Sequence, residues 1–134
     1  MSKKTITITY GDLARDFYPA ITSLGTLQIK GLDALISIAK TRNTAKTEYT
    51  IYSDMVKQIA EEKCDKDESG KPIIEEKGLR YSDIQDGIET NRQIEELNKK
   101  EIEMQVHPID AKDLKGVEGL TGNMISGLGE FMKM

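Results

Sequence analysis

The sequence contains little cysteine and few aromatic residues, and it has no long apolar run. Cys64 is the only cysteine in 134 residues, so the chain cannot form an intramolecular disulfide. No apolar stretch is long enough for a membrane span or a signal peptide, which favours a cytoplasmic protein. Tryptophan is absent, and two Phe and five Tyr are the only aromatic residues, so the core is expected to be aliphatic.

A strong positive charge is also missing. The 19 Lys and Arg residues are outnumbered by 23 Asp and Glu, which gives a formal net charge of −4. A general affinity for nucleic acid requires a basic surface, so this balance argues against it. The hydrophobic fraction of 37% and the charged fraction of 31% are typical of a globular protein with solvated helices. We expect one domain that spans residues 1–134.

Two segments far apart in the sequence have the alternation of a β-strand. Residues 5–10 read Thr-Ile-Thr-Ile-Thr-Tyr, and residues 101–107 place Ile102, Met104 and Val106 on one face. A strand pair buries its apolar face only against other elements. We therefore expect a two-stranded antiparallel ribbon that packs on helices.

The remaining periodic segments are helical. A first helix follows Gly11-Asp12, with a kink expected at Pro19, and a long helix is expected from about residue 32 to residue 64. The pattern Ser82-Asp83-Ile84-Gln85 is typical of a helix start and predicts a third helix to about Lys99.

Residues 65–80 form a charged, irregular connection, and residues 110–114 a short helical turn. Thr121 is expected to cap a last helix with apolar positions at Ile125, Leu128, Phe131 and Met132. The predicted fold is α+β and mainly α. A helical hairpin carries the third helix across it, and the C-terminal helix closes the core beside the small ribbon.

The apolar positions of the two longer helices predict which faces they bury. For the long helix they are Leu32, Leu35, Ile36, Ala39, Tyr49, Tyr52, Val56 and Ile59. For the third helix they are Ile84, Ile88, Ile94 and Leu97. The centre of the long helix, residues 41–47, is polar on almost every side, so it is expected either to leave the core or to contact a partner.

This polar centre is the candidate binding site. Lys40, Arg42 and Lys46 could meet a phosphate or an acidic surface, and Tyr49 and Tyr52 could stack on a ligand or donate a hydrogen bond. A solvated helix face with two core tyrosines is the alternative interpretation.

Catalytic and metal-binding patterns are weak. His107 and Cys64 are single residues without the local sequence of a nucleophile and its base, and one Cys with one His cannot form a typical zinc site. The segment from Asp65 to Glu76 partly matches a calcium loop, but Pro72 interrupts it, and a solvated turn is the simpler interpretation. Carboxylates are abundant, yet nothing distinguishes a reacting pair. The sequence therefore favours a protein without catalytic residues, metal or cofactor.

The order of these segments resembles a family of short proteins of unknown function from bacteriophages and prophages. The matching parts are Tyr18-Pro19-Ala20-Ile21, the acidic turn from Asp67 to Pro72, and Pro108-Ile109 followed by Leu114. The chain departs from the pattern at Lys30-Gly31, where many members have Pro-Ala, and in its glycine-rich last helix.

The resemblance implies a phage setting in the bacterial cytosol, and it supplies no catalytic motif. We expect a binding protein that engages a host or phage protein, with inhibition of an antiviral defence system as its effect. One alternative is a virion or assembly component that acts by self-association. Another is an oligomeric sponge that sequesters a nucleotide signal through Arg42, Lys46 and the tyrosines.

Overall fold

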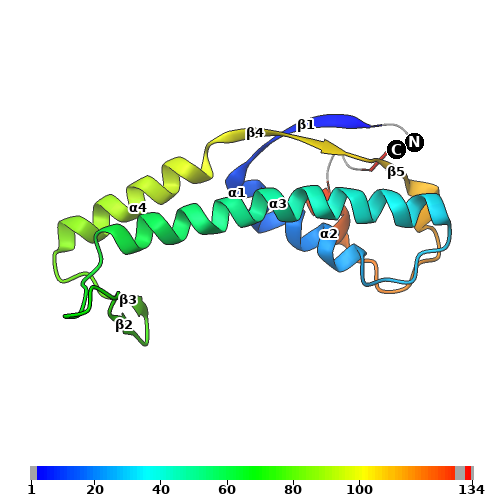
Figure 1. Ribbon diagram of the computed structural model, residues 1–134. Helices are drawn as coiled ribbons and strands as arrows, with labels where there is room; N and C mark the ends of the chain where they lie inside the picture. Colours follow the sequence, from blue (N-terminus) through cyan, green and yellow to red (C-terminus); the bar gives the residue numbers. More distant parts are fainter. Residues whose placement is uncertain (1–2, 129–131, 134) are drawn as a thin grey trace.

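The computed structural model describes residues 3–128 and 132–133 and has an α+β, mainly helical fold (Figure 1). The strands are β1 (Lys4–Thr9), β2 (Ile74–Glu75), β3 (Gly78–Leu79), β4 (Glu101–Val106), β5 (Ile109–Asp110) and β6 (Met132–Lys133). The helices are α1 (Tyr10–Asp12), a π-helix (Leu13–Phe17), α2 (Tyr18–Leu24), α3 (Leu32–Glu62), α4 (Ile84–Asn98), a 3-10 helix (Ala111–Leu114) and α5 (Gly122–Leu128). Within the described residues, no helix is long and apolar enough to cross a membrane.

The predicted ribbon is confirmed. β1 pairs antiparallel with β4, and Ile6 lies opposite Met104 on the buried face. The ladder continues one step past β1, because the amide of Tyr10 donates to the carbonyl of Lys100 over 3.0 Å. Thr9 then ends the strand by capping α1, its hydroxyl accepting from the amide of Asp12. β1 therefore leads directly into α1, and the strand ends at Thr9, one residue before the end of the alternating pattern.

The irregularity expected at Pro19 lies upstream of that residue. The amide of Tyr18 donates to the carbonyl of Leu13, five residues earlier, so the segment Leu13–Phe17 is a π-helix. Pro19 then sits in the first turn of α2, where its missing amide costs little. Leu13 and Phe17 are both buried in the core.

The core lies between the N-terminal helices, the first half of α3, the ribbon and α5. Its largest fully buried side chains are aliphatic apart from one phenylalanine and one threonine: Phe17, Leu13, Ile21, Leu24, Leu128, Val106 and Thr41. This composition confirms the aliphatic core expected from the sequence.

The buried face of α3 differs from the predicted one. Leu32 and Leu35 are 73% and 45% exposed, whereas Ser37, Thr41 and Ala45 are buried. These small residues recur every four positions, so they share one face and let the helix axis approach the core closely. Of the two expectations for residues 41–47, the one that they leave the core was wrong, because Thr41 and Ala45 are fully buried. Contact of this stretch with a partner stays a prediction.

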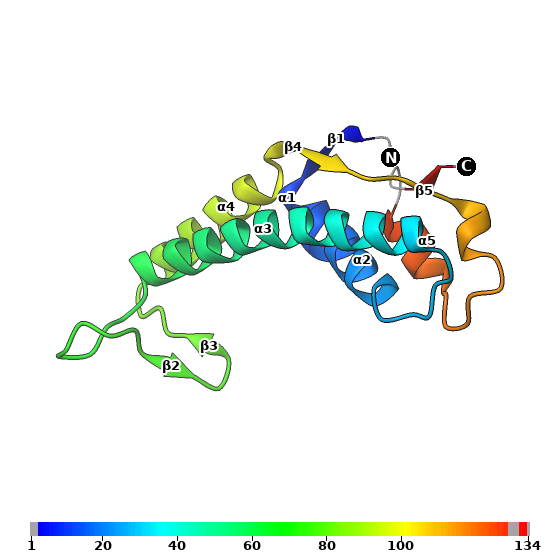
Figure 2. The same ribbon diagram turned by 45° about the vertical axis from the view of Figure 1, so that its right-hand side comes forward.

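The second half of α3 leaves the core and forms an arm together with the residues that follow it (Figures 1 and 2). We define the arm as residues 48–99. α4 runs back along α3, as shown by the hydroxyl of Tyr81 donating to the carbonyl of Ala60 and the hydroxyl of Tyr52 donating to Asn98 Oδ1 over 2.5 Å. α4 thus lies along α3. The prediction that it crosses the helical hairpin was wrong.

The predicted apolar stripe of α4 is also wrong. Leu97 is buried and Ile94 is half-buried, but Ile84 and Ile88 are exposed. The six-residue step from Ile88 to Ile94 turns the helix by about 240°, so the two pairs face different directions. The buried position in this stretch is Thr90, at 3% exposure.

The C-terminal region adds one pairing that the sequence pattern did not predict. β5 and β6 are parallel, with Ile109 opposite Met132 and Asp110 opposite Lys133. Met132 therefore belongs to a strand and not to the last helix, which ends at Leu128 in the described part of the chain. Phe131 lies outside the described residues. The predicted cap of α5 is present, since the hydroxyl of Thr121 accepts from the amide of Met124.

Candidate functional site

The five residues of the predicted site do not share one surface. Lys40 and Lys46 are exposed, and Arg42, Tyr49 and Tyr52 are half-buried. Six helical positions separate Lys40 from Lys46, which places them about 120° apart around α3. A β-carbon built on Gly25 would lie 2.9 Å from Arg42 Nη1, so this guanidinium lies at the C-terminal end of α2. A cation there is favoured by the partial negative charge of the helix end.

The two tyrosines belong to a cluster at the root of the arm. The rings of Tyr18 and Tyr49 stack with centroids 4.5 Å apart, and those of Tyr10 and Tyr52 stack at 5.7 Å. Burial raises the pKa of Tyr10 and of Tyr52, and the Glu48 carboxylate raises that of Tyr10 further. The hydroxyl of Tyr10 donates to Glu48 over 3.3 Å. These rings join the arm to the core, and one face of Tyr49 is already occupied by Tyr18.

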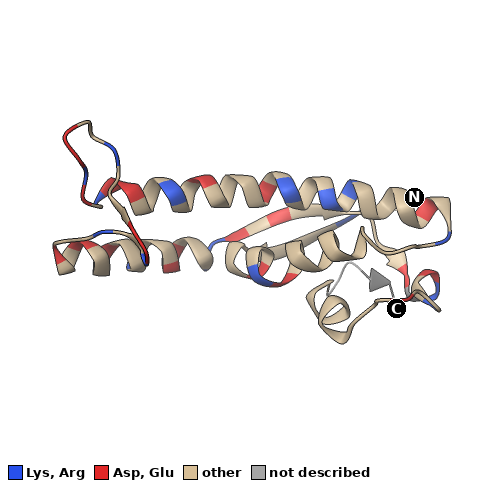
Figure 3. Cartoon of the chain, turned by 90° about the horizontal axis from the view of Figure 1, so that it is seen from below, with Lys and Arg blue, Asp and Glu red and all other residues tan. Residues whose placement is uncertain are grey.

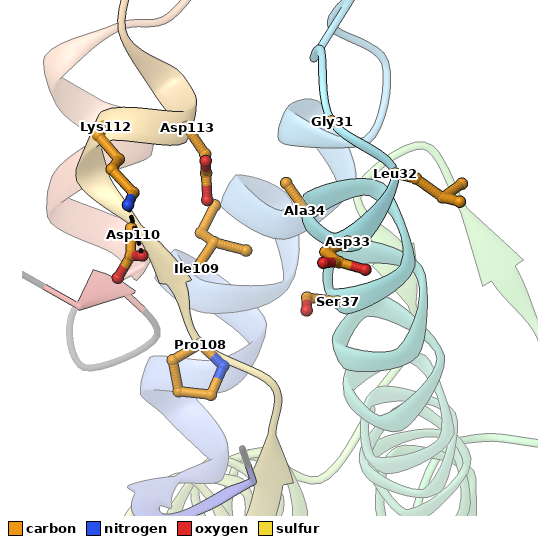
Figure 4. Close-up of a pocket in the computed structure, with 10 residues that line it drawn as sticks. All are labelled: Gly31, Leu32, Asp33, Ala34, Ser37, Pro108, Ile109, Asp110, Lys112 and Asp113. Carbon is orange, nitrogen blue, oxygen red and sulfur yellow. Dashed lines mark ion pairs between the residues drawn. The ribbon is translucent and has the colours of Figure 1, made fainter. Parts of the chain in front are cut away.

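An open cleft of about 480 Å³ lies where the start of α3 faces β5 and the 3-10 helix (Figure 4). Three of its ten lining residues are acidic: Asp33, Asp110 and Asp113. Asp110 is 3.8 Å from Lys112 in an ion pair. Within the part of the chain that the structure describes, no three Cys, His, Asp or Glu side chains come together as a metal site. The cleft is acidic, but its groups do not converge on one point.

The candidate catalytic residues lie far apart in the fold. Cys64 is buried at the end of α3 and its thiol donates to the carbonyl of Glu61. His107 follows β4, and its backbone amide donates to Thr41 Oγ1 over 2.8 Å. Ring atom Nδ1 of His107 is buried without a hydrogen-bond partner. The two residues therefore cannot act as a nucleophile and its base.

The environment of His107 gives a testable pH dependence. Burial lowers the pKa of His107, and the nearby charges of Lys40 and Lys3 lower it further. The unfolded chain binds this proton at about pH 6.5 while the folded protein resists it, so stability falls as the pH decreases below about 6.5 and levels off below the folded pKa. Thermal unfolding between about pH 5 and 7.5 should show this slope, and the His107→Gln variant should lose it. An equal slope in both proteins would contradict the assignment to His107.

The tip of the arm, residues 65–82, is organised around one carboxylate. Asp65 accepts hydrogen bonds from Arg80 Nε at 2.7 Å and from the amide and hydroxyl of Ser82. These bonds, first those of Ser82 and then that of Arg80, lower the pKa of Asp65. The carboxylate of Asp67 accepts from the amides of Ser69 and Lys71 and closes a turn. Both carboxylates thus stabilise the protein backbone of the tip, which disfavours the calcium-loop interpretation.

Removing the charge of Asp65 should loosen only the tip. In Asp65→Asn, amide hydrogen exchange of residues 65–82 should become faster, while the melting temperature of the protein changes little, because the bonds of this carboxylate run to Arg80 and Ser82 within the tip. Glu68→Gln, an exposed change in the same loop, is the control and should leave exchange unchanged. Unaltered exchange in Asp65→Asn would show that the tip does not depend on this carboxylate.

The exposed apolar side chains of the arm are the remaining candidate. Ile84 and Ile88 lie one turn apart on α4 and are 74% and 58% exposed. Ile74, in the β2–β3 hairpin that projects from the end of the arm, is 75% exposed. We call Ile84 and Ile88 the α4 isoleucine pair. The apolar periodicity of α4 predicted that Ile84 and Ile88 would be buried, and nothing in the local pattern indicates their exposure.

No model of a protein family, no curated protein and no solved structure matches this chain significantly.

Proposed function

We propose that this chain is a non-enzymatic binding protein that engages another protein through its arm. The observation that carries the proposal is the α4 isoleucine pair, two large apolar side chains one turn apart and more than half exposed. Isolating such side chains from water is favourable, by roughly 1.5–3 kcal/mol for each fully buried isoleucine. A row of apolar residues on a helix is a common recognition surface for proteins.

The distribution of charged groups supports binding more than catalysis. The acidic and basic groups with shifted pKa values are dispersed among the described residues: Arg15 in the π-helix, His107 beyond β4, Asp65 at the tip, and Glu89 with Arg92 on α4. Arg92 lowers the pKa of Glu89 by a hydrogen bond between their side chains. General acid–base chemistry needs such groups to meet at one reacting atom.

The biological setting proposed for this function, an infected bacterium, is based on the sequence alone. The resemblance to phage and prophage proteins suggests a partner in an infected bacterium, and a host defence protein is the partner class that we propose. A cytosolic location follows from the same resemblance.

The α4 isoleucine pair provides the test. We expect a tagged protein to recover a specific partner from infected cells, and Ile84→Asp/Ile88→Asp to lose it, because a charge cannot be buried unpaired in the interface. Leu32→Asp is the matched control, since Leu32 is 73% exposed and lies outside the arm. Circular dichroism should show that both variants are folded. If the double variant recovers the same partner as the unchanged protein, the arm is not the binding surface.

Self-association is the alternative that the same surface allows. A second copy could place its own α4 against the first and complete a four-helix bundle. Sedimentation equilibrium distinguishes this alternative from the first, since it would give a dimer for the unchanged protein and a monomer for the double variant.

The nucleotide sponge has less support. Tyr49 already stacks on Tyr18, and the hydroxyl of Tyr52 is bonded to Asn98. Lys40 and Lys46 point away from each other around α3. We expect no shift in melting temperature with a panel of cyclic nucleotides. A shift that Arg42→Ala and Lys46→Ala abolish would revive this alternative.

A further inference from the structure

We infer that the segment recognised by the α4 isoleucine pair is a basic amphipathic helix of the partner protein. The inference rests on the proposed function and adds the chemistry of the partner. It follows from three features of the arm, namely the charge around the isoleucine pair, the course of the exposed stripe along α4, and the division of charge between the arm and the rest of the chain.

The helix that carries the isoleucine pair is acidic. Residues 83–98 contain five Asp or Glu and one basic residue, Arg92. Arg92 already forms ion pairs with Glu89 and Glu96. Asp86 and Glu95 form no ion pair with any described residue. No Lys or Arg occurs from residue 81 to residue 91, so the immediate surroundings of both isoleucines along the chain are acidic or neutral.

One acidic side chain, that of Glu95, continues the apolar stripe. Positions 84, 88, 91 and 95 recur at the spacing of one helical face, and all four are exposed. Along this face the order is Ile84, Ile88, Asn91, Glu95. A complementary helix must therefore offer apolar side chains to one end of the stripe and a basic side chain to the other. Lys and Arg are suited to this, since their aliphatic stems can cover the isoleucines while the charged groups reach the carboxylates.

The net charge of the whole arm also favours a basic partner, through electrostatic attraction at longer range. The arm, residues 48–99, contains 14 acidic and eight basic residues, whereas the remaining 82 residues contain nine and 11. Acidic residues are visible along α4 and at the tip of the arm in Figure 3, and basic residues along the first half of α3. A field of this sign steers a basic partner to the arm and disfavours an acidic one.

The experiment is a selection from a displayed library of random peptides of about 16 residues, long enough for roughly four helical turns. We expect the enriched peptides to be net positive, with apolar residues spaced three or four apart. Binding should weaken as salt rises, as expected when charge pairs contribute to the affinity. Glu95→Lys, which reverses the one charge on this face, should weaken a selected peptide by about fivefold and leave the melting temperature nearly unchanged, and Leu32→Asp should bind normally.

The other outcomes separate this inference from the proposed function. Enrichment of neutral or acidic peptides that still need Ile84 and Ile88 would overturn the basic partner and leave the binding arm in place. Peptides that bind equally to Ile84→Asp/Ile88→Asp, or no enrichment, would also overturn the inference. A dimer that the double variant abolishes would identify a second copy as the occupant and would overturn it as well. The proposed function itself fails if the unchanged protein recovers no specific cellular partner, or if the double variant recovers the same partner.

Discussion

Gly127→Ala should destabilise the protein, although alanine is the better helix former. A β-carbon at this position would lie 2.6 Å from the carbonyl oxygen of Asp16 and 2.9 Å from the β-carbon of Ala20. Both atoms belong to the N-terminal helices, so α5 must move away from them. Overpacking of this kind costs typically 1–3 kcal/mol, which exceeds the gain in helix propensity of about 1 kcal/mol. We expect a net loss of about 1–2 kcal/mol in the free energy of unfolding, measured in urea.

Gly122→Ala is the matched control in the same helix. A β-carbon at Gly122 meets no atom within 4 Å, so only the change in helix propensity remains. This variant should be as stable as the unchanged protein or slightly more stable. If Gly127→Ala were as stable as Gly122→Ala, the close packing of α5 against the π-helix and α2 would be incorrect.

The sequence predicts those elements whose pattern is local. Alternation in residues 5–10 and 101–107 identifies two strands and their apolar faces, and the structure places Ile6 opposite Met104 on the shared face. Asp83 caps α4 through a bond from the amide of Gln85, within one residue of the start that the sequence indicated. Such features need no knowledge of distant parts of the chain.

The features that the sequence does not predict depend on packing between distant segments. Ser37, Thr41 and Ala45 look polar or neutral, yet they line the buried face of α3 because the ribbon approaches it there. A search for small residues at four-residue spacing would have found this face. The opposite error occurs at the candidate binding surface, where residues expected to be buried are exposed. Ile84 and Ile88 have the pattern of core residues, and only the position of α4 along α3 shows that they are exposed.

The hydroxyl of Thr41 is the other site where one substitution should have a large effect. Thr41 is fully buried, and its Oγ1 accepts the backbone amide of His107 over 2.8 Å, which ties the middle of α3 to the end of β4. Thr41→Val preserves the shape and the β-branching but removes the acceptor. A buried amide left without a partner costs about 1–3 kcal/mol, so we expect a loss of that size in the free energy of unfolding. Exchange of the His107 amide should also become faster.

Thr47→Val on the same helix separates this bond from the general effect of the substitution. Thr47 is exposed, and its hydroxyl donates to the carbonyl of Asn43 within α3. Its replacement should change stability by less than about 0.5 kcal/mol, as is usual at surface positions. Thr41→Ser should retain part of the lost stability, because serine keeps an oxygen within reach of the amide. Equal losses in Thr41→Val and Thr47→Val would mean that the bond between α3 and β4 does not contribute to the stability of the core.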